Sequence, residues 1–474
     1  MNKENVYKLS SWGAFVSILF IAVGSLFPYM QVLLIGKPLL PNITLKLILL
    51  VLLVINYLLR REKLSRKIMV PWLIFACYLL VSSAYLLFHL KYPLSLVAYG
   101  FNTYYFYILL LPLLPSLRGM ISAELIKKIF IFLGISLLLL SLIQHITDSM
   151  IIDVFRVTNE SKDLSFYGHI RAISLFMNAL SCGLFYTIVA ALSYFSAFDA
   201  PQRNGRKIAC LACSGLLLYG VYITYMRTAY MMAVFAMTTL FLLTTLNNGM
   251  LKKFLVRLPV ANALCGILVI GILWLGVNKS IFPANINKYI FKESLYTFSR
   301  SLTEYNTAEL RYNSYFKIDP DSSKPKISTS VNVFRGDSFA MRIIEWKAYG
   351  SIAFHNTTSA FLGLGYTQSD RLKNLEEFYI DNTYLSVIMQ IGLLGLFCIV
   401  FLVWRLWLYL AENYRYNSMS IVLFAVFSTL PIIAFFNNVL AEYFLLIVIF
   451  FMVLPRKGYV EFCPSKKMGQ LKSC

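Results

Sequence analysis

One stretch of the sequence, residues 338–396, collects side chains that could grip a phosphate and accept a proton. Arg342 and Trp346 are spaced one helical turn apart, and Asp381-Asn382 stand directly before a long apolar segment. A guanidinium matches phosphate oxygens with paired hydrogen bonds, and a carboxylate can deprotonate a hydroxyl as a general base. Charged groups at the boundary of an otherwise apolar chain usually serve a function. This stretch is therefore the first candidate for chemistry.

Two further arginines are expected at the same boundary. Arg227 stands at the end of the seventh apolar run, and Arg171 precedes the sixth. Arg227 and Arg171 could instead be structural, since a long cation at the end of a span can simply reach the lipid headgroups. Arg342 beside Trp346 could likewise serve as an interfacial anchor. Basic residues are scarce in the short segments on the outer side, which favours a functional role for these arginines. Several arginines without an acidic metal cluster can hold a diphosphate, so we expect no metal and no other cofactor.

The residues around the next helix start have competing interpretations. Asp381 is a candidate N-cap of the helix that follows, and equally a candidate general base for a sugar hydroxyl. Asn382 and Tyr384 suit hydrogen bonding or stacking on a sugar, or are ordinary boundary residues. His355 and His169 are alternative bases, although a lone histidine is more often a surface residue.

Composition places these residues in a membrane protein. The chain has 474 residues, of which 59% are hydrophobic and 14% are charged, against about a quarter charged in soluble domains. We predict an all-α polytopic protein with about twelve spans. These are Trp12–Leu33, Leu40–Leu59, Ile68–Phe88, Leu94–Leu114, Ile129–Thr147, Ala172–Phe195, Ile208–Met226, Ala229–Leu246, Pro259–Val277, Thr383–Trp404, Ser418–Phe436 and Val439–Leu454.

The positive charge follows the membrane and not a nucleic-acid surface. The net charge is +21, and the basic residues fall in every second loop, as the positive-inside rule predicts. Both termini are then cytoplasmic. The organisation is a membrane domain of residues 1–277, an extracytoplasmic cap of residues 278–382, three spans in residues 383–454 and a tail of residues 455–474. A connection as long as the cap should be folded.

Other motifs are few. The eight cysteines fall in apolar spans or in the tail, so they predict no disulfide framework, and Cys210-x-x-Cys213 has no accompanying ligand cluster. No Walker, Gly-x-Gly-x-x-Gly or His-Glu-x-x-His motif occurs, which argues against an ATP-driven pump or a zinc protease.

The order of the motifs resembles the O-antigen ligase and Wzy-type polymerase superfamily. That family carries Arg-x3-Trp, Gly-x-Gly, then His- or Asp-Asn-x-Tyr-Leu with a Gly-x2-Gly helix. It also has Ser-Arg-Thr-Ala at the end of span seven and an Arg…Phe-x-Asn-Pro motif before span six. The matching residues are Arg342 and Trp346, Gly363 and Gly365, Asp381-Asn382 with Tyr384-Leu385, Gly392 and Gly395, Arg227-Thr228-Ala229, and Arg171 with Phe176 and Asn178.

The resemblance implies a polymerase that joins undecaprenyl-diphosphate-linked oligosaccharides on the outer face of the cytoplasmic (inner) membrane, without nucleotide. It implies that Arg227 and Arg342 bind the diphosphate, that Arg171 assists and that Asp381 activates the acceptor. The partners would be lipid-linked substrates, membrane lipid, a chain-length regulator and a flippase, with no nucleic acid. Three features depart from the family pattern. Ligases usually carry His at the position of Asp381, which favours a polymerase. The stretch from Trp346 to Gly363 is longer than usual, and Met177 and Ala179 do not match the Phe-x-Asn-Pro motif.

Three other functions compete with polymerisation. A ligase that moves polymer to lipid A core or to protein shares the site and differs in its acceptor. A flippase or secondary transporter predicts charged residues deep in the spans and broken helices near the midplane. A non-catalytic scaffold predicts that the outer arginines and Asp381 are freely replaceable.

Overall fold

The computed structural model describes most of the apolar part of the chain. The described residues are 3–24, 31, 42–119, 121–147, 165–166, 169–170, 172–176, 179–198, 204–246, 316–317, 326–327, 350, 353–354, 356–365 and 382–455. The predicted span Pro259–Val277, the predicted helix of Arg342 and Trp346, and nearly all of the predicted cap and tail lie outside these residues.

Helices make up nearly all of the described structure. Those of the first half are α1 (Lys3–Val23), α3 (Asn42–Arg60), α4 (Arg66–Ala84), α5 (Leu94–Gly100), α6 (Phe106–Leu109), α7 (Ala123–Thr147), α9 (Ala179–Ser196), α10 (Asn204–Ile223) and α11 (Arg227–Leu246). The second half contributes α16 (Thr357–Leu362), α17 (Thr383–Asn413), α18 (Ser418–Phe427), α19 (Leu430–Phe436) and α20 (Leu440–Val453).

Shorter elements join these helices. Two π-helical turns are η1 (Tyr85–His89) and η2 (Phe101–Tyr105), and two 3-10 turns are η3 (Leu114–Leu117) and η7 (Tyr414–Tyr416). The all-α prediction is confirmed, and two antiparallel pairs of two-residue strands accompany the helices: β1 (Ser165–Phe166) with β2 (His169–Ile170), and β3 (Phe316–Lys317) with β4 (Lys326–Ile327). Both pairs fall in loops that the sequence predicts outside the spans.

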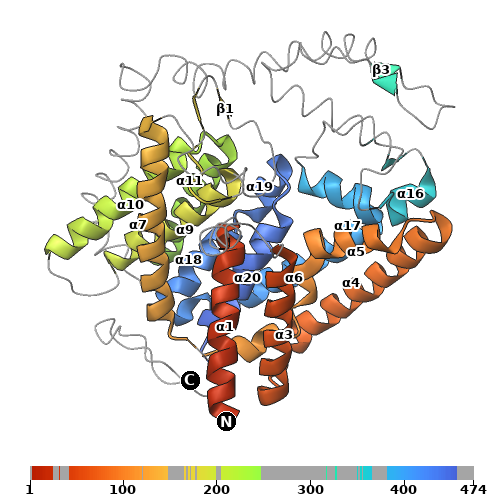
Figure 1. Ribbon diagram of the computed structural model, residues 1–474, viewed down its shortest axis with the longest axis horizontal. Helices are drawn as coiled ribbons and strands as arrows, with labels where there is room; N and C mark the ends of the chain where they lie inside the picture. The colour runs from red at the N-terminus through yellow and green to blue at the C-terminus, as the bar shows by residue number, and fades with distance from the viewer. Residues whose placement is uncertain are drawn as a thin grey trace.

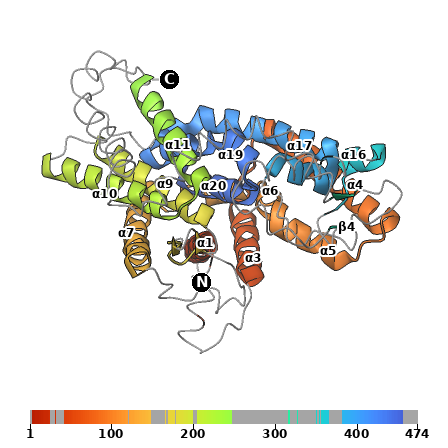
Figure 2. The ribbon, with the colours of Figure 1, turned by 90° about the horizontal axis from the view of Figure 1, so that it is seen from above.

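The helices form two groups around a buried centre. One group contains α7, α9, α10 and α11, the other contains α4, α5, α16 and α17, and α20 lies between them in both views (Figures 1 and 2). Burial differs between central and peripheral helices: 83% of the apolar segment of α9 is buried, against 22% of that of α3. Peripheral helices instead turn large apolar side chains outward, with Phe132 75% exposed and Phe397 69% exposed. Such surfaces suit contact with lipid.

Eight of the described segments are long and apolar enough to cross a membrane. Two shorter apolar helices, Thr228–Leu243 and Leu440–Val453, accompany them. The predicted starts and ends agree at several places, including Thr147 at the end of α7, Thr383 at the start of α17 and Ser418 at the start of α18. The class of a multi-pass helical membrane protein is therefore supported by the structure as well as by composition.

The predicted span Leu94–Leu114 is helical but not a regular α-helix throughout. α5, η2 and α6 follow one another without a gap from Leu94 to Leu109, and turns and η3 continue the chain to Leu117. Lys46 Nζ donates to the Asn102 carbonyl at 2.6 Å and Trp72 Nε1 donates to the Ile108 carbonyl at 2.9 Å, so side chains satisfy carbonyl groups in this segment. Pro112 and Pro115 bring no N–H donors, which prevents a regular helix from continuing.

The start of the predicted span Ala172–Phe195 is wrong, because α9 begins at Ala179. Residues 172–176 are not helical, and Ser174 has a φ of 54°. The Gln144 side chain of α7 holds both backbone groups of Ser174, accepting from its N–H at 2.8 Å and donating to its carbonyl at 3.2 Å. A buried amide thus replaces the helical hydrogen bonds that this segment would otherwise need.

The loops that the charge pattern assigns to one side of the membrane meet at one end of the molecule. Tyr7 Oη donates to the Ser116 carbonyl at 3.0 Å, and Gly119 N donates to the Leu454 carbonyl at 3.1 Å. Lys67 Nζ at the start of α4 lies 3.0 Å from Glu412 Oε1 near the end of α17, within one of the two helix groups. These contacts agree with the alternation of basic loops along the chain.

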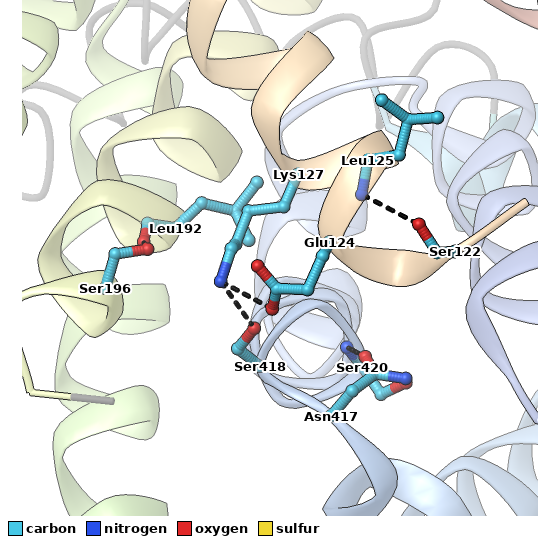
Figure 3. Close-up of polar contacts among 9 residues, drawn as sticks. All are labelled: Ser122, Glu124, Leu125, Lys127, Leu192, Ser196, Asn417, Ser418 and Ser420. Carbon is cyan, nitrogen blue, oxygen red and sulfur yellow. Dashed lines mark hydrogen bonds and ion pairs between the residues drawn. The ribbon is translucent and has the colours of Figure 1, made fainter. Parts of the chain in front are cut away.

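A buried lysine joins α7 to α18 at this same end. Figure 3 shows Lys127 Nζ directed at Glu124 Oε1, 2.7 Å away, and at Ser418 Oγ, 3.4 Å away. The Lys127 side chain is 11% exposed and that of Glu124 is 60% exposed. Asn417 caps α18 by accepting from Ser420 N at 2.8 Å. The ion pair lies within α7, and the hydrogen bond from Lys127 to Ser418 links α7 to the start of α18.

We expect Glu124→Gln to lower the free energy of unfolding by about 1 kcal/mol, because it leaves the desolvated Lys127 ammonium without its carboxylate. The measurement is thermal unfolding of the purified protein in detergent. Glu4→Gln is the matched control, since Glu4 and Lys8 are about two-thirds exposed and 3.0 Å apart, and should change stability by less than about 0.5 kcal/mol. Equal effects of the two substitutions would show that burial of Lys127 has no energetic weight.

Candidate functional site

The start of α17 is fixed by Asn382 and not by its neighbour. Asn382 Oδ1 accepts from Leu385 N at 2.9 Å, the bond of an N-cap, and its Nδ2 donates to the Phe435 carbonyl at 2.9 Å. The interpretation of Asp381 as the N-cap is therefore wrong by one residue. Asp381 itself lies outside the described residues, and its role as a general base stays a prediction. Tyr384 extends the same contact, donating from Oη to the Pro431 carbonyl at 2.9 Å.

A polar joint connects the start of α17 to the start of α11. Thr383 Oγ1 donates to the Asn437 carbonyl at 2.6 Å and accepts from Val439 N at 3.1 Å. Asn437 Nδ2 donates to Thr228 Oγ1, and both side chains are buried. Asn437 stands between α19 and α20, so one residue ties four helix ends together.

This joint brings two sequence-predicted positions to one place in the fold. Arg227 is the first residue of α11, directly before Thr228, and Asp381 is two residues before Thr383. The chain segments that carry these residues are therefore held to one another through Asn437. Buried hydrogen bonds of this kind fix the relative position of helix ends, because an unpaired group would lose its full desolvation energy.

A third predicted position approaches the same region along the backbone. Ala172 N donates to the Ile223 carbonyl at 3.2 Å at the end of α10. Ile173 is fully buried and packs with Ala179 and Met226. Arg171, which precedes Ala172, lies outside the described residues, but the segment that follows it is fixed against the turn from α10 to α11. That turn leads to Arg227.

The predicted Gly-x-Gly and Gly-x2-Gly motifs meet each other. Gly363 and Gly365 follow α16 with φ values of 85° and 111°, and Gly392 interrupts α17 with φ 74°. A Cβ on Gly363 would lie 2.5 Å from the Gln390 carbonyl oxygen, and one on Gly392 would lie 2.1 Å from the Phe361 carbonyl oxygen. The glycines therefore permit a backbone crossing between α16 and α17 that no side chain could enter.

Backbone and side-chain hydrogen bonds close this crossing. Leu364 N donates to the Met389 carbonyl at 2.7 Å, and Gly365 N donates to the Gln390 carbonyl at 3.2 Å. Tyr78 Oη contacts the carbonyl oxygens of Phe361, at 3.0 Å, and of Ile391. Tyr92 Oη donates to the Leu364 carbonyl at 2.9 Å. Irregular backbone within apolar surroundings needs such partners, because lipid supplies none.

Further polar groups continue from the crossing to the joint. Tyr105 Oη of η2 donates to Gln390 Oε1 at 2.9 Å, and Gln390 Nε2 donates to Ser386 Oγ at 3.0 Å. Asn438 Nδ2 donates to the same Ser386 Oγ at 3.1 Å. Sequence reasoning missed this network. The sequence features that could have predicted it are the polar pair Asn437-Asn438 between two apolar segments and the polar Gln390 within a third apolar segment.

Of the residues predicted to bind substrate, the structure describes Asn382 and Tyr384 and places both at the start of α17. Arg342, Trp346 and His355 lie outside the described residues and stay predictions. Within the described part of the chain, His, Cys, Asp and Glu side chains form no group of three that could hold a metal ion.

Comparison with family models, with curated proteins and with solved structures finds no match to this chain. Fold and apolar surface define the class: a multi-pass α-helical membrane protein. The candidate site of this protein is built on the Asn437 joint and on the glycine crossing between α16 and α17.

Proposed function

We propose that this protein is a lipid-linked glycosyltransferase that polymerises surface-polysaccharide repeat units on the outer face of the cytoplasmic membrane. One observation carries the proposal: Asn437 ties the chain directly after Arg227 to the chain directly after Asp381. A cation for a diphosphate and a base for a hydroxyl are thereby carried on helix ends that cannot drift apart. The order of the motifs supports the same function.

In the proposed reaction the acceptor sugar hydroxyl attacks the anomeric carbon of the donor. A new C–O bond forms as the bond to the diphosphate breaks, and undecaprenyl diphosphate leaves with the electron pair. Arg227 and Arg342 stabilise the charge that develops on the leaving group, with Arg171 beside them. Asp381 takes the hydroxyl proton. Trp346, Tyr384, Asn382 and His355 would contact the sugars, and inversion follows from the single displacement.

The test is complementation of a strain deleted for this gene, with surface polysaccharide resolved on a gel and protein level followed by blot. Arg227→Ala, Arg342→Ala and Asp381→Asn should each leave single repeat units on the anchor, with at least about a hundredfold less polymer. Arg206→Ala is the matched control, because Arg206 is exposed near the start of α10, and it should give a full ladder.

Two other results would change the assignment. Finished polymer left on its lipid carrier in the deletion strain identifies a ligase instead. A full ladder from all three variants removes these residues from the site, as a scaffold would require. A polymerase would work with a flippase that delivers repeat units and with a chain-length regulator.

A second candidate, a flippase or secondary transporter, is favoured by the break in α17. Discontinuous helices with unwound backbone commonly line transport sites, and Gly392 interrupts α17 where α16 crosses it. Proteoliposomes separate the two functions. A transporter moves a fluorescent lipid-linked oligosaccharide between leaflets and leaves its length unchanged, whereas a polymerase lengthens it.

A further inference from the structure

The last turn of α7 holds two backbone turns in the left-handed region, which residues other than glycine rarely adopt. Ser174 has a φ of 54° and Tyr225 a φ of 50°. Gln144 bonds both backbone groups of Ser174, at 2.8 and 3.2 Å. The next residue, His145, places its Nδ1 3.3 Å from Tyr225 Oη. Such strained backbone persists only where its surroundings hold it, and it is concentrated at functional sites.

The two turns lie next to two of the arginines of the proposed site. Ser174 is three residues after Arg171, and Tyr225 is two residues before Arg227, the first residue of α11. The φ angles of these turns set the direction in which the chain continues, so they decide where each arginine-bearing segment lies. Figures 1 and 2 place α7 in the same helix group as α10 and α11, which the second turn connects.

Contacts between the two turns make them one unit. Ala172 N donates to the Ile223 carbonyl at 3.2 Å, and Ile173 packs against Met226. The Met226 carbonyl in turn accepts from Tyr230 N at 3.2 Å, which closes the first turn of α11. A shift of the chain around Ser174 is therefore passed to the start of α11.

Gln144 is the side chain that holds this unit from α7. It is fully buried, and its amide accepts from the N–H of Ser174 and donates to its carbonyl. An apolar side chain of the same size can do neither. With such a side chain, Ser174 would lose both hydrogen bonds in a buried place, and the cost of its left-handed φ would no longer be offset. The turn would then relax and carry the linked start of α11 with it.

We propose that Gln144 is a positioning residue that sets the relative position of the segments carrying Arg171 and Arg227, and thereby the preference of the site for a diphosphate. This inference rests on the proposed function, in which Arg227 binds the diphosphate and Arg171 assists. Two linked phosphates need two cations in a fixed relative position, whereas a single phosphate needs one. Gln144 acts through these two segments and does not itself touch the substrate.

The test compares binding of undecaprenyl diphosphate and of undecaprenyl phosphate to the purified protein in nanodiscs, below the unfolding temperature of every variant. The variant is Gln144→Met, which keeps the length of the side chain and removes its amide. Wild type should prefer the diphosphate. The variant should lose at least about tenfold of that preference, while its affinity for the monophosphate changes by less than about threefold. A merely structural role of Gln144 would lower the unfolding temperature and leave this preference unchanged.

Asn56→Leu is the matched control, because Asn56 is also a fully buried amide, and its hydrogen bonds come from Ser10 and Ser11 of α1. It should lower the unfolding temperature and keep the preference for the diphosphate. Gln144→Asn serves if Gln144→Met does not fold, since it keeps the amide and shortens its reach. A folded Gln144 variant that keeps the full preference would overturn the inference, and so would wild type that binds both probes equally. Wild type that binds neither probe would overturn the proposed function.

Discussion

Gly392→Ala is expected to prevent accumulation of the folded protein. The added Cβ would lie 2.1 Å from the Phe361 carbonyl oxygen and 2.6 Å from Leu362 N, and the φ of 74° disfavours any L side chain. Backbone of α16 cannot move aside without breaking the bonds that Leu364 and Gly365 make to α17. Strain and overpacking together should cost roughly 3–5 kcal/mol.

The measurement is the yield and the thermal unfolding of the variant in detergent. Gly205→Ala is the control, because a Cβ there meets no atom within 4 Å and the residue is in the first turn of α10. That change should leave stability unaltered or raise it slightly. If Gly392→Ala unfolds at the wild-type temperature, α16 and α17 do not cross at Gly392.

Thr383→Val is expected to lower stability by about 2–4 kcal/mol although it hardly changes volume. The substitution removes the hydroxyl that donates to the Asn437 carbonyl at 2.6 Å and accepts from Val439 N at 3.1 Å. Both backbone groups would then be buried without that partner, and each such group costs about 1–3 kcal/mol. The helix starts that carry Arg227 and Asp381 would lose their tie.

Thr383→Ser is the matched control, since it keeps the hydroxyl and removes one methyl group. Unfolding in detergent should place the serine variant within about 1.5 kcal/mol of wild type. In the complementation assay the valine variant should also give less polymer per folded molecule than the serine variant. Equal polymer yields per folded molecule would mean that the joint has no part in activity.

Much of the architecture could be read from the chain alone. Long apolar runs predict the helices because a span must satisfy its own backbone hydrogen bonds. The starts of α17 at Thr383 and of α18 at Ser418 were predicted from the change from polar to apolar residues. The alternation of basic loops predicts which segments lie on the same side of the membrane, and the Tyr7–Ser116 and Gly119–Leu454 contacts bring such segments to one end of the molecule.

Hydropathy failed where backbone is irregular inside an apolar run. The segment from Leu94 to Leu114 is apolar enough to predict one regular α-helix, yet it contains the π-helical turn η2 and its last α-helical residue is Leu109. Lys46 and Trp72 from other helices donate to two of its carbonyls, those of Asn102 and Ile108. Residues 172–176 leave the helix because Gln144 takes the backbone groups of Ser174. The side chains that hydrogen-bond to these two segments are distant in sequence, so no local sequence pattern predicts the contacts.

For the candidate site, sequence determined the chemical types and tertiary structure decided their neighbours. The chemistry of guanidinium and carboxylate groups pointed to Arg227 and Asp381, and the family resemblance pointed to the glycine motifs. Only the fold showed that Asn437 joins the two helix starts and that Gly363 crosses α17 at its break. Long-range hydrogen bonds and close backbone approaches depend on how helices pack, and a single sequence carries no record of which distant residues come into contact.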